Sequence, residues 1–193
     1  MKALLHSRRN GSLKSPDAYA THGDFCKIFT EDMAGLHLLA LLLTGDPALA
    51  EQCFVEGFED SIHSNRIFKQ WAHSWSRRAI IKNAIRMVRP SPSEAGTQVV
   101  SHKLDAETTI SASLAAVFHL QPFERFVLVM SVLEGYTGQD CATLLNCARQ
   151  DVIASRSRAL QQLAQADANP QTTPEPAGQL LHTDGLLPFS GAA

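Results

Sequence analysis

The stretch "LLNCARQDVIASRSRALQQL", Leu144–Leu163, decides the fold expected for this chain. It holds two helical runs joined by a short polar turn, and the second run carries Arg149, Arg156 and Arg158. The whole chain has a formal net charge of −2. Three arginines on one short helix of a nearly neutral chain indicate a local anionic partner, and DNA is the partner this pattern favours.

The turn fits a helix-turn-helix, in which a supporting helix and a tight turn place a second helix in the major groove of DNA. Thr137 is placed to cap the supporting helix, and the small Ala142 permits a close crossing of the two helices. Asn146 sits where the supporting helix stops, and asparagine tolerates the left-handed backbone expected there. The second helix is expected to begin near Arg149.

The second helix is predicted to have a buried side and an exposed side. The positions of this helix that are expected to face inward are Val152, Ala159, Leu160 and Leu163. Leu145 of the supporting helix is expected to share the same core. The outward positions are candidates for DNA contact: Arg149, Gln150, Ile153, Arg156 and Ser157. Arginine bonds phosphates or the guanine edge, and glutamine pairs with adenine. An ordinary helical hairpin is the alternative interpretation of the same spacing.

Composition bounds the class of protein. The 193 residues, of which 45% are hydrophobic, suffice for one or two small domains with buried cores. No apolar run is long enough to span a bilayer, and "LHLLALLL" (Leu36–Leu43) is expected to be a buried helix. We expect no signal peptide. The cysteines form no disulfide framework, which fits a reducing cytoplasm: Cys26, Cys53, Cys141 and Cys147.

Almost no strand signal is present, so the predicted class is all-α, with two small helical domains joined by a flexible linker. The linker prediction rests on the prolines, glycine and serines of "RPSPSEAGTQVVSHK". The expected organisation is a flexible arm at 1–29, a helical domain at 30–89, a linker at 90–104, a helix-turn-helix domain at 105–165 and a mostly disordered tail at 166–193.

Local signals predict where individual helices begin. Thr30 is expected to cap the helix "EDMAGLHLLALLL", and Asp46 to cap the next one with Pro47 at its first position. A third helix is expected over 65–88. Trp71 is expected to pack in the core of the domain, and Trp75 is about equally suited to packing in the core or to binding a partner. In the second domain, Pro122 should begin a helix and Gly135 should end it.

Charge is segregated along the first domain. Between Asp46 and Asp60 there are five acids and no Lys or Arg, whereas between Ser61 and Pro90 there are seven basic residues and no acid. This separation indicates either two partners of opposite charge or two solvated helix faces that attract each other.

Two segments carry a family resemblance. Arg125–Leu163 resembles region 4 of extracytoplasmic-function sigma factors of the sigma-70 family, through Glu124, Arg125, Leu133, Glu134, Gly135, Tyr136, Gln139, Ala142, Leu144, Leu145, Cys147, Val152, Ser157, Arg158 and Ala159. The segments "LLLTGDPALAEQCFVEGF" and "FKQWAHSWSRRAIIKNAIRMVR" are similar to region 2 of the same family. The two matches stand in the family's order and cover about two thirds of the chain.

The resemblance implies a bacterial, cytoplasmic initiation factor whose partners are core RNA polymerase and promoter DNA, with an anti-sigma factor as a further candidate. It implies polymerase binding by Asp46, Glu51, Gln52 and Glu56. It implies contact with the melted −10 element by Trp75, Arg77, Arg78, Lys82 and Arg86. It also implies contact with the −35 element by the five outward positions of the helix that begins near Arg149. Basic and aromatic side chains suit single strands, because charge holds the backbone while rings stack on bases.

The sequence departs from the family pattern at Ile153, Ser155 and Arg156, and Asn146 replaces the usual turn glycine. The alternatives are therefore a degenerate sigma-like protein that binds polymerase or a regulator without initiating transcription, and a helix-turn-helix regulator. An enzyme is not expected, because no phosphate loop, CxxC or HExxH motif occurs. We expect no catalytic residue, metal, cofactor or membrane partner.

Overall fold

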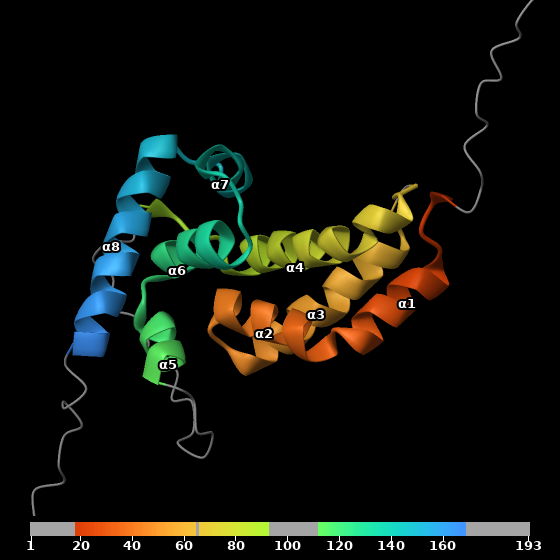
Figure 1. Cartoon of the computed structure of the whole chain (residues 1–193), viewed down its shortest axis with the longest axis horizontal. Helices are drawn as coiled ribbons and strands as arrows, with labels where there is room; N and C mark the ends of the chain where they lie inside the picture. The colour runs from red at the N-terminus through yellow and green to blue at the C-terminus, as the bar shows by residue number, and fades with distance from the viewer. Residues whose placement is uncertain (1–17, 65, 93–111, 169–193) are drawn as a thin grey trace, which may run out of the picture.

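The computed structural model describes residues 18–64, 66–92 and 112–168, which form an all-α protein and confirm the predicted class (Figure 1). The main helices are α1 (His22–Glu31), α2 (Met33–Thr44), α3 (Pro47–Ile62), α4 (Ala72–Val88), α5 (Ala112–His119), α6 (Pro122–Leu128), α7 (Gly138–Leu145) and α8 (Arg149–Ala168). A 3-10 turn, η2 (Lys69–Trp71), precedes α4, and a π-helical turn, η4 (Val129–Leu133), continues α6. The described part contains no strand, only an isolated antiparallel bridge between Tyr19 and Phe68. Of the described helices, none combines the length and apolarity that crossing a bilayer requires.

Helix α1 was not predicted, because the sequence analysis placed its residues in the flexible arm; the helix predicted after Thr30 corresponds to α2, which begins at Met33. Thr21 and Asp24 form a capping box, in which each side chain bonds the other residue's backbone N–H. Phe25 and Phe29 are buried, so this helix packs into the core. The predicted arm is therefore wrong for residues 22–29, while residues 1–17 lie outside the described part. Thr30 is not a cap, since it lies inside α1 and its hydroxyl donates to the Cys26 carbonyl.

The predicted start of α3 is confirmed, and that of α4 is corrected. The Asp46 carboxylate accepts from the Leu49 N–H at 2.9 Å, with Pro47 in the first position of the helix. Helix α4 begins at Ala72 rather than at residue 65, after the short η2 turn. Trp71 was expected in the core but is 56% exposed, because it lies in that turn and meets Phe68 edge-on instead.

Helices α3 and α4 cross very closely. A Cβ atom at Gly57 would lie 2.5 Å from Cδ1 of Ile80, so only glycine fits this crossing without displacing the isoleucine. Ile80, Ile81 and Ala84 are buried on the same side of α4. Helix α4 is thus packed against α3 along its apolar side.

In the second group, α5–α8, the predicted starts of α6, α7 and α8 and the predicted ends of the α6–η4 segment and α7 agree with the structure. Pro122 occupies the first turn of α6, and Gly135 has a left-handed φ of 69° just beyond η4. Asn146 is also left-handed, at φ 51°, and ends α7. Helix α8 begins at Arg149 and runs through residues 166–168, which had been assigned to the tail. Residues 169–193 lie outside the described part.

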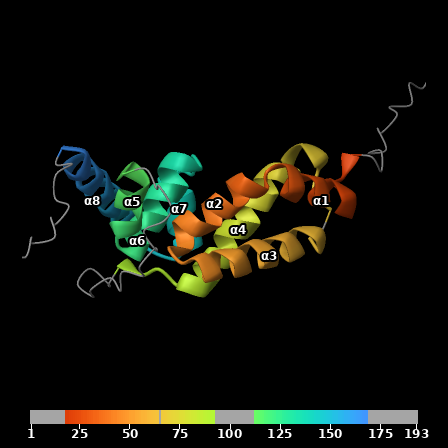
Figure 2. The ribbon, with the colours of Figure 1, turned by 90° about the horizontal axis from the view of Figure 1, so that it is seen from below.

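The described residues of the two groups pack together. One apolar cluster contains Leu36, Leu43 and Ile80 from the first group and Phe126 and Met130 from the second. Figure 2 shows α6 and α7 against the end of the α1–α4 group, with α8 on the far side. The predicted linker falls mainly within 93–111, outside the described part.

Arg125 joins the two groups at a helix end. Its guanidinium is buried and donates to the Leu43 and Thr44 carbonyls, the latter at 3.1 Å, and it also donates to Phe118 and Leu120 carbonyls. The Leu43 and Thr44 groups are among the last carbonyls of α2, which have no partner within their own helix. Burial lowers the pKa of Arg125 to about 10, so the guanidinium remains charged at neutral pH. Its positive charge interacts favourably with the negative end of the α2 helix dipole.

We expect Arg125→Met to lower the free energy of unfolding by about 2 kcal/mol, because it keeps the apolar stem and leaves several buried carbonyls without a donor. Chemical denaturation followed by circular dichroism measures the change. Arg156→Met is the matched control, since Arg156 is exposed, and should change stability by less than about 0.5 kcal/mol. Equal losses in both variants would contradict the role of Arg125.

We expect Gly45→Ala to destabilise the protein by about 2 kcal/mol, because an L-residue is strained there and loses room beside Arg125. Gly45 has φ 71°, and its added Cβ would lie 2.7 Å from Nη2 of Arg125. Gly138→Ala is the control, because nothing lies within 4 Å of its added Cβ. Thermal unfolding of both variants tests this, and an unchanged melting temperature for Gly45→Ala would refute it.

Candidate nucleic-acid interface

The α7–α8 pair is fixed at both sides of its turn. Thr137 and Asp140 form a capping box at the start of α7, with the Thr137 hydroxyl 2.6 Å from the Asp140 carboxylate. After the left-handed Asn146, the Asp151 carboxylate accepts from the Ala148 N–H at 3.2 Å at the start of α8. These bonds fix the first turns of α7 and α8, and the shared burial of Ala142, Leu145 and Val152 packs the two helices against each other.

The buried side of α8 was predicted only in part. Val152 and Ala159 are buried and Leu163 is half-buried, but Leu160 is 44% exposed and was wrongly placed inside. Ser155 is fully buried and was missed. Its position three residues after Val152 and four before Ala159 was the available signal. Its small side chain allows α8 to approach, and its Oγ accepts from Nη2 of Arg158 at 2.9 Å.

A polar anchor holds α8 on α6. Nε of Arg158 donates to the Glu124 carboxylate at 2.7 Å, and Nε2 of Gln162 donates to the same carboxylate at 3.3 Å. The Glu124 side chain is only 7% exposed, so this pair is partly shielded from water. Arg158, which the sequence pattern did not include among the DNA contacts, is thus a packing residue.

The five predicted −35 residues lie on the exposed side of α8: Arg149, Gln150, Ile153, Arg156 and Ser157. Neither Arg149 nor Arg156 pairs with an acid among the described residues, so both guanidinium groups point to solvent without a charged partner. Ser157 donates to the Ile153 carbonyl at 3.1 Å, which leaves its oxygen able to accept a further bond. The structure therefore brings this set together on one face.

The five predicted −10 residues divide between two places. Trp75, Arg78 and Lys82 line one pocket of about 340 Å³, together with Asp60 and His63. Nζ of Lys82 lies 5.9 Å from the centroid of the Trp75 ring. Nε1 of Trp75 is buried and has no hydrogen-bond partner among the described residues. A basic, aromatic pocket with an unused donor is suited to a planar polar group.

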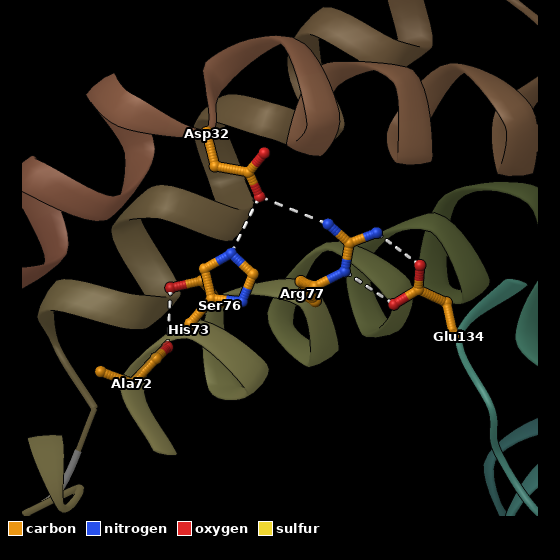
Figure 3. Close-up of polar contacts among 6 residues, drawn as sticks. All are labelled: Asp32, Ala72, His73, Ser76, Arg77 and Glu134. Carbon is orange, nitrogen blue, oxygen red and sulfur yellow. Dashed lines mark hydrogen bonds and ion pairs between the residues drawn. The ribbon is translucent and has the colours of Figure 1, made fainter. Parts of the chain in front are cut away.

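The other two −10 residues are engaged in ion pairs. Arg77 donates from Nε to Glu134 at 2.8 Å and from Nη2 to the second oxygen of the same carboxylate (Figure 3). Arg86 bonds the Glu56 carboxylate. Glu56 belongs to the predicted polymerase-binding set, so residues assigned to two different partners contact each other. Arg77 and Arg86 do not line the Trp75 pocket.

The predicted polymerase-binding residues belong to α3 and its cap. Asp46 caps the helix, and Glu51 and Gln52 are exposed in its first turns. Nε2 of Gln52 donates to Glu56 at 2.9 Å. This bond, with the Arg86 contact, holds the pKa of Glu56 below its usual range. Glu51 and Gln52 are thus the more accessible residues of the predicted polymerase-binding set.

Sequence reasoning assigned no role to Asp32, Glu134 or Tyr136. Glu134 and Tyr136 belong to the "EGY" motif of the resemblance, which was the only signal for them. Arg78 lies 6.0 Å from the centroid of the Tyr136 ring. Burial raises the pKa of the Tyr136 hydroxyl, which therefore stays protonated at neutral pH. Both adjacent arginines of α4 thus contact the segment that follows η4.

The described part holds no group of three His, Cys, Asp or Glu side chains arranged to bind a metal ion. Burial raises the pKa of Cys53 to about 12 and that of Cys141 to about 11. Thiols with these values stay protonated at neutral pH and are poor nucleophiles. Both side chains are buried, as expected for small core residues.

The sequence matches no protein-family model, and no curated protein matches it at a significant level.

We expect Thr137→Ala to raise the pKa of Asp140 toward its ordinary value, because bonds from the Thr137 side chain and backbone hold that pKa low. The folded-state pKa is depressed, so the contribution of the Asp140 carboxylate is present above its unfolded pKa and is lost as the pH falls through the lowered value. Carboxyl-carbon NMR titration measures the shift. Asp24, capped by Thr21 in the same way, should not move, and a parallel shift there would contradict the local cause.

Proposed function

We propose that this chain is a cytoplasmic, sigma-like transcription initiation factor, without enzymatic activity of its own. It binds core RNA polymerase and directs it to promoter DNA. The observation that carries the proposal is the exposed side of α8, where Arg149, Gln150, Ile153, Arg156 and Ser157 lie together on a helix anchored from behind. In this proposal α7 and α8 are a helix-turn-helix, and α8 enters the major groove of the −35 element.

The proposed −35 contacts follow from the chemistry of the exposed side chains. Arg149 and Arg156 bond phosphates or guanine edges, and Gln150 bonds adenine. Ile153, which is 54% exposed, is suited to apolar contact with a thymine methyl group.

The proposed −10 contact is the pocket beside α4. The Trp75 ring offers a stacking surface, and Lys82 and Arg78 attract the backbone of a melted strand. The exposed Glu51 and Gln52 of α3 are proposed to contact polymerase.

A second candidate is a degenerate sigma-like protein that binds polymerase, or a regulator such as an anti-sigma factor, without initiating transcription. It is favoured by the ion pairs of Arg77 and Arg86, because each pair engages with a carboxylate an arginine that was predicted to contact the −10 element. A helix-turn-helix regulator that does not bind polymerase remains the third alternative.

We expect purified chain and bacterial core polymerase to initiate at discrete sites on a genomic promoter library, with shared −35 and −10 elements among the sequenced transcripts. Arg149→Ala and Arg156→Ala should each lower these transcripts about tenfold, because each removes a contact to the −35 element. Lys82→Ala should lower open-complex formation, measured by permanganate reactivity of melted thymines. Arg66→Ala is the control, since it removes an exposed positive charge outside both sites.

The outcomes separate the candidates. Polymerase binding without specific start sites would favour the degenerate protein. DNA binding without polymerase binding would favour the helix-turn-helix regulator. Equal loss in Arg66→Ala and Arg156→Ala would show that only total charge matters and would remove the proposed reading of the −35 element.

A further inference from the structure

Glu134 bonds Arg77, whose guanidinium the sequence resemblance assigns to the −10 element. Its side chain is 8% exposed and bonds Arg77 through both oxygens, across 57 positions of sequence. Carboxylate and phosphate oxygens use the same paired donors of arginine. Glu134 therefore occupies the donors through which Arg77 would bind a phosphate.

A second acid completes the contact. Nη1 of Arg77 donates to the Asp32 carboxylate at 3.4 Å, and the same carboxylate oxygen lies 3.0 Å from Nε2 of His73 (Figure 3). We call Asp32, Arg77 and Glu134 the Arg77 bridge. It ties the α1–α2 junction and α4 to the end of η4, and so links the first helical group to the second.

In the described structure, Arg77 and Arg149 lie too close together to contact the −10 and −35 elements at the same time. Elements centred near −10 and −35 are about 25 base pairs apart, or about 85 Å of duplex. Between Glu134 and Arg149 the chain can extend no more than about 40 Å, because α7 is helical. Since Glu134 bonds Arg77, Arg149 lies within about 50 Å of Arg77. The two groups must therefore separate before both elements are bound.

We propose that the Arg77 bridge is an internal latch, which holds the α5–α8 group against α4 and keeps Arg77 from DNA until binding separates the groups. The identity of the released ligand rests on the proposed function, whereas the closure itself does not. A ligand that binds only the open arrangement shifts the equilibrium toward it. Removing the latch should therefore favour both the open arrangement and DNA binding.

Contacts other than the Arg77 bridge also hold the two helical groups together. Arg125 still bonds the carbonyls at the end of α2, and the shared apolar cluster still joins the groups. Breaking the bridge therefore shifts the equilibrium without opening every molecule. For this reason the test needs a measurement of shape as well as of binding.

The experiment uses the full chain with Glu134→Gln, which keeps the shape of the side chain and removes its charge. Glu31→Gln is the matched control, because it makes the same charge change on an exposed side chain. Small-angle X-ray scattering measures the radius of gyration. Fluorescence anisotropy with a labelled, random-sequence single-stranded DNA measures affinity at about 0.15 M ionic strength.

We expect Glu134→Gln to increase the radius of gyration and to tighten DNA binding about fivefold, with little change in Glu31→Gln. Arg77→Glu should also expand the protein, since the new acid faces Glu134 and Asp32. Adding Glu134→Arg should restore compactness by reversing the pair. Circular dichroism confirms that each variant is folded.

Scattering decides whether the latch exists. No expansion in a folded Glu134→Gln protein, or equal expansion in Glu31→Gln, would overturn the latch even if the wild type binds promoter DNA. Expansion of Glu134→Gln and Arg77→Glu, with recovery in the reversed pair, would support the latch even if no variant bound DNA. In that last case the proposed function, and not the latch, would fail.

Discussion

The packing of the two helical groups depends on one buried guanidinium. Arg125 lies on α6, yet it completes the hydrogen bonding of α2, whose final carbonyls would otherwise be buried without donors. The charge has no acidic partner among the described residues, and the helix end compensates for its burial. Gly45 is left-handed beside it and leaves room for the guanidinium. The turn after α2 and the first turn of α6 are therefore constrained by each other.

Local structure was predictable where a short-range bond determines it. The caps at Asp46 and Thr137 and the left-handed Asn146 were read correctly, because each depends on residues within four positions. The arm was misread although the signals were present: Thr21 and Asp24 have the spacing of a capping box, and Phe25, Ile28 and Phe29 recur at helical spacing. Trp71 was misplaced because the 3-10 turn before α4 shifts the helical phase at this residue.

The candidate interface was predictable on α8 and not on α4. Helical spacing is enough to find the exposed side of α8, and only the exposed Leu160 and buried Ser155 departed from it. On α4 the family resemblance, and not helical spacing, grouped Arg77 and Arg86 with Trp75. Their partners come from positions distant in sequence, Glu134 and Glu56, which no periodicity reveals. A pairing of that kind requires the tertiary structure or covariation between positions.

The pairing of Arg86 with Glu56 has a consequence for how the chain meets its partners. The acidic segment and the basic segment are separate in the sequence, but in the fold Glu56 of the first and Arg86 of the second form an ion pair. Paired charges produce a field that falls off within roughly one Debye length, about 8 Å at physiological ionic strength. The Arg86–Glu56 pair therefore contributes little to the long-range field of the protein, which depends instead on basic groups without an acidic neighbour, such as Arg149 and Arg156 on α8.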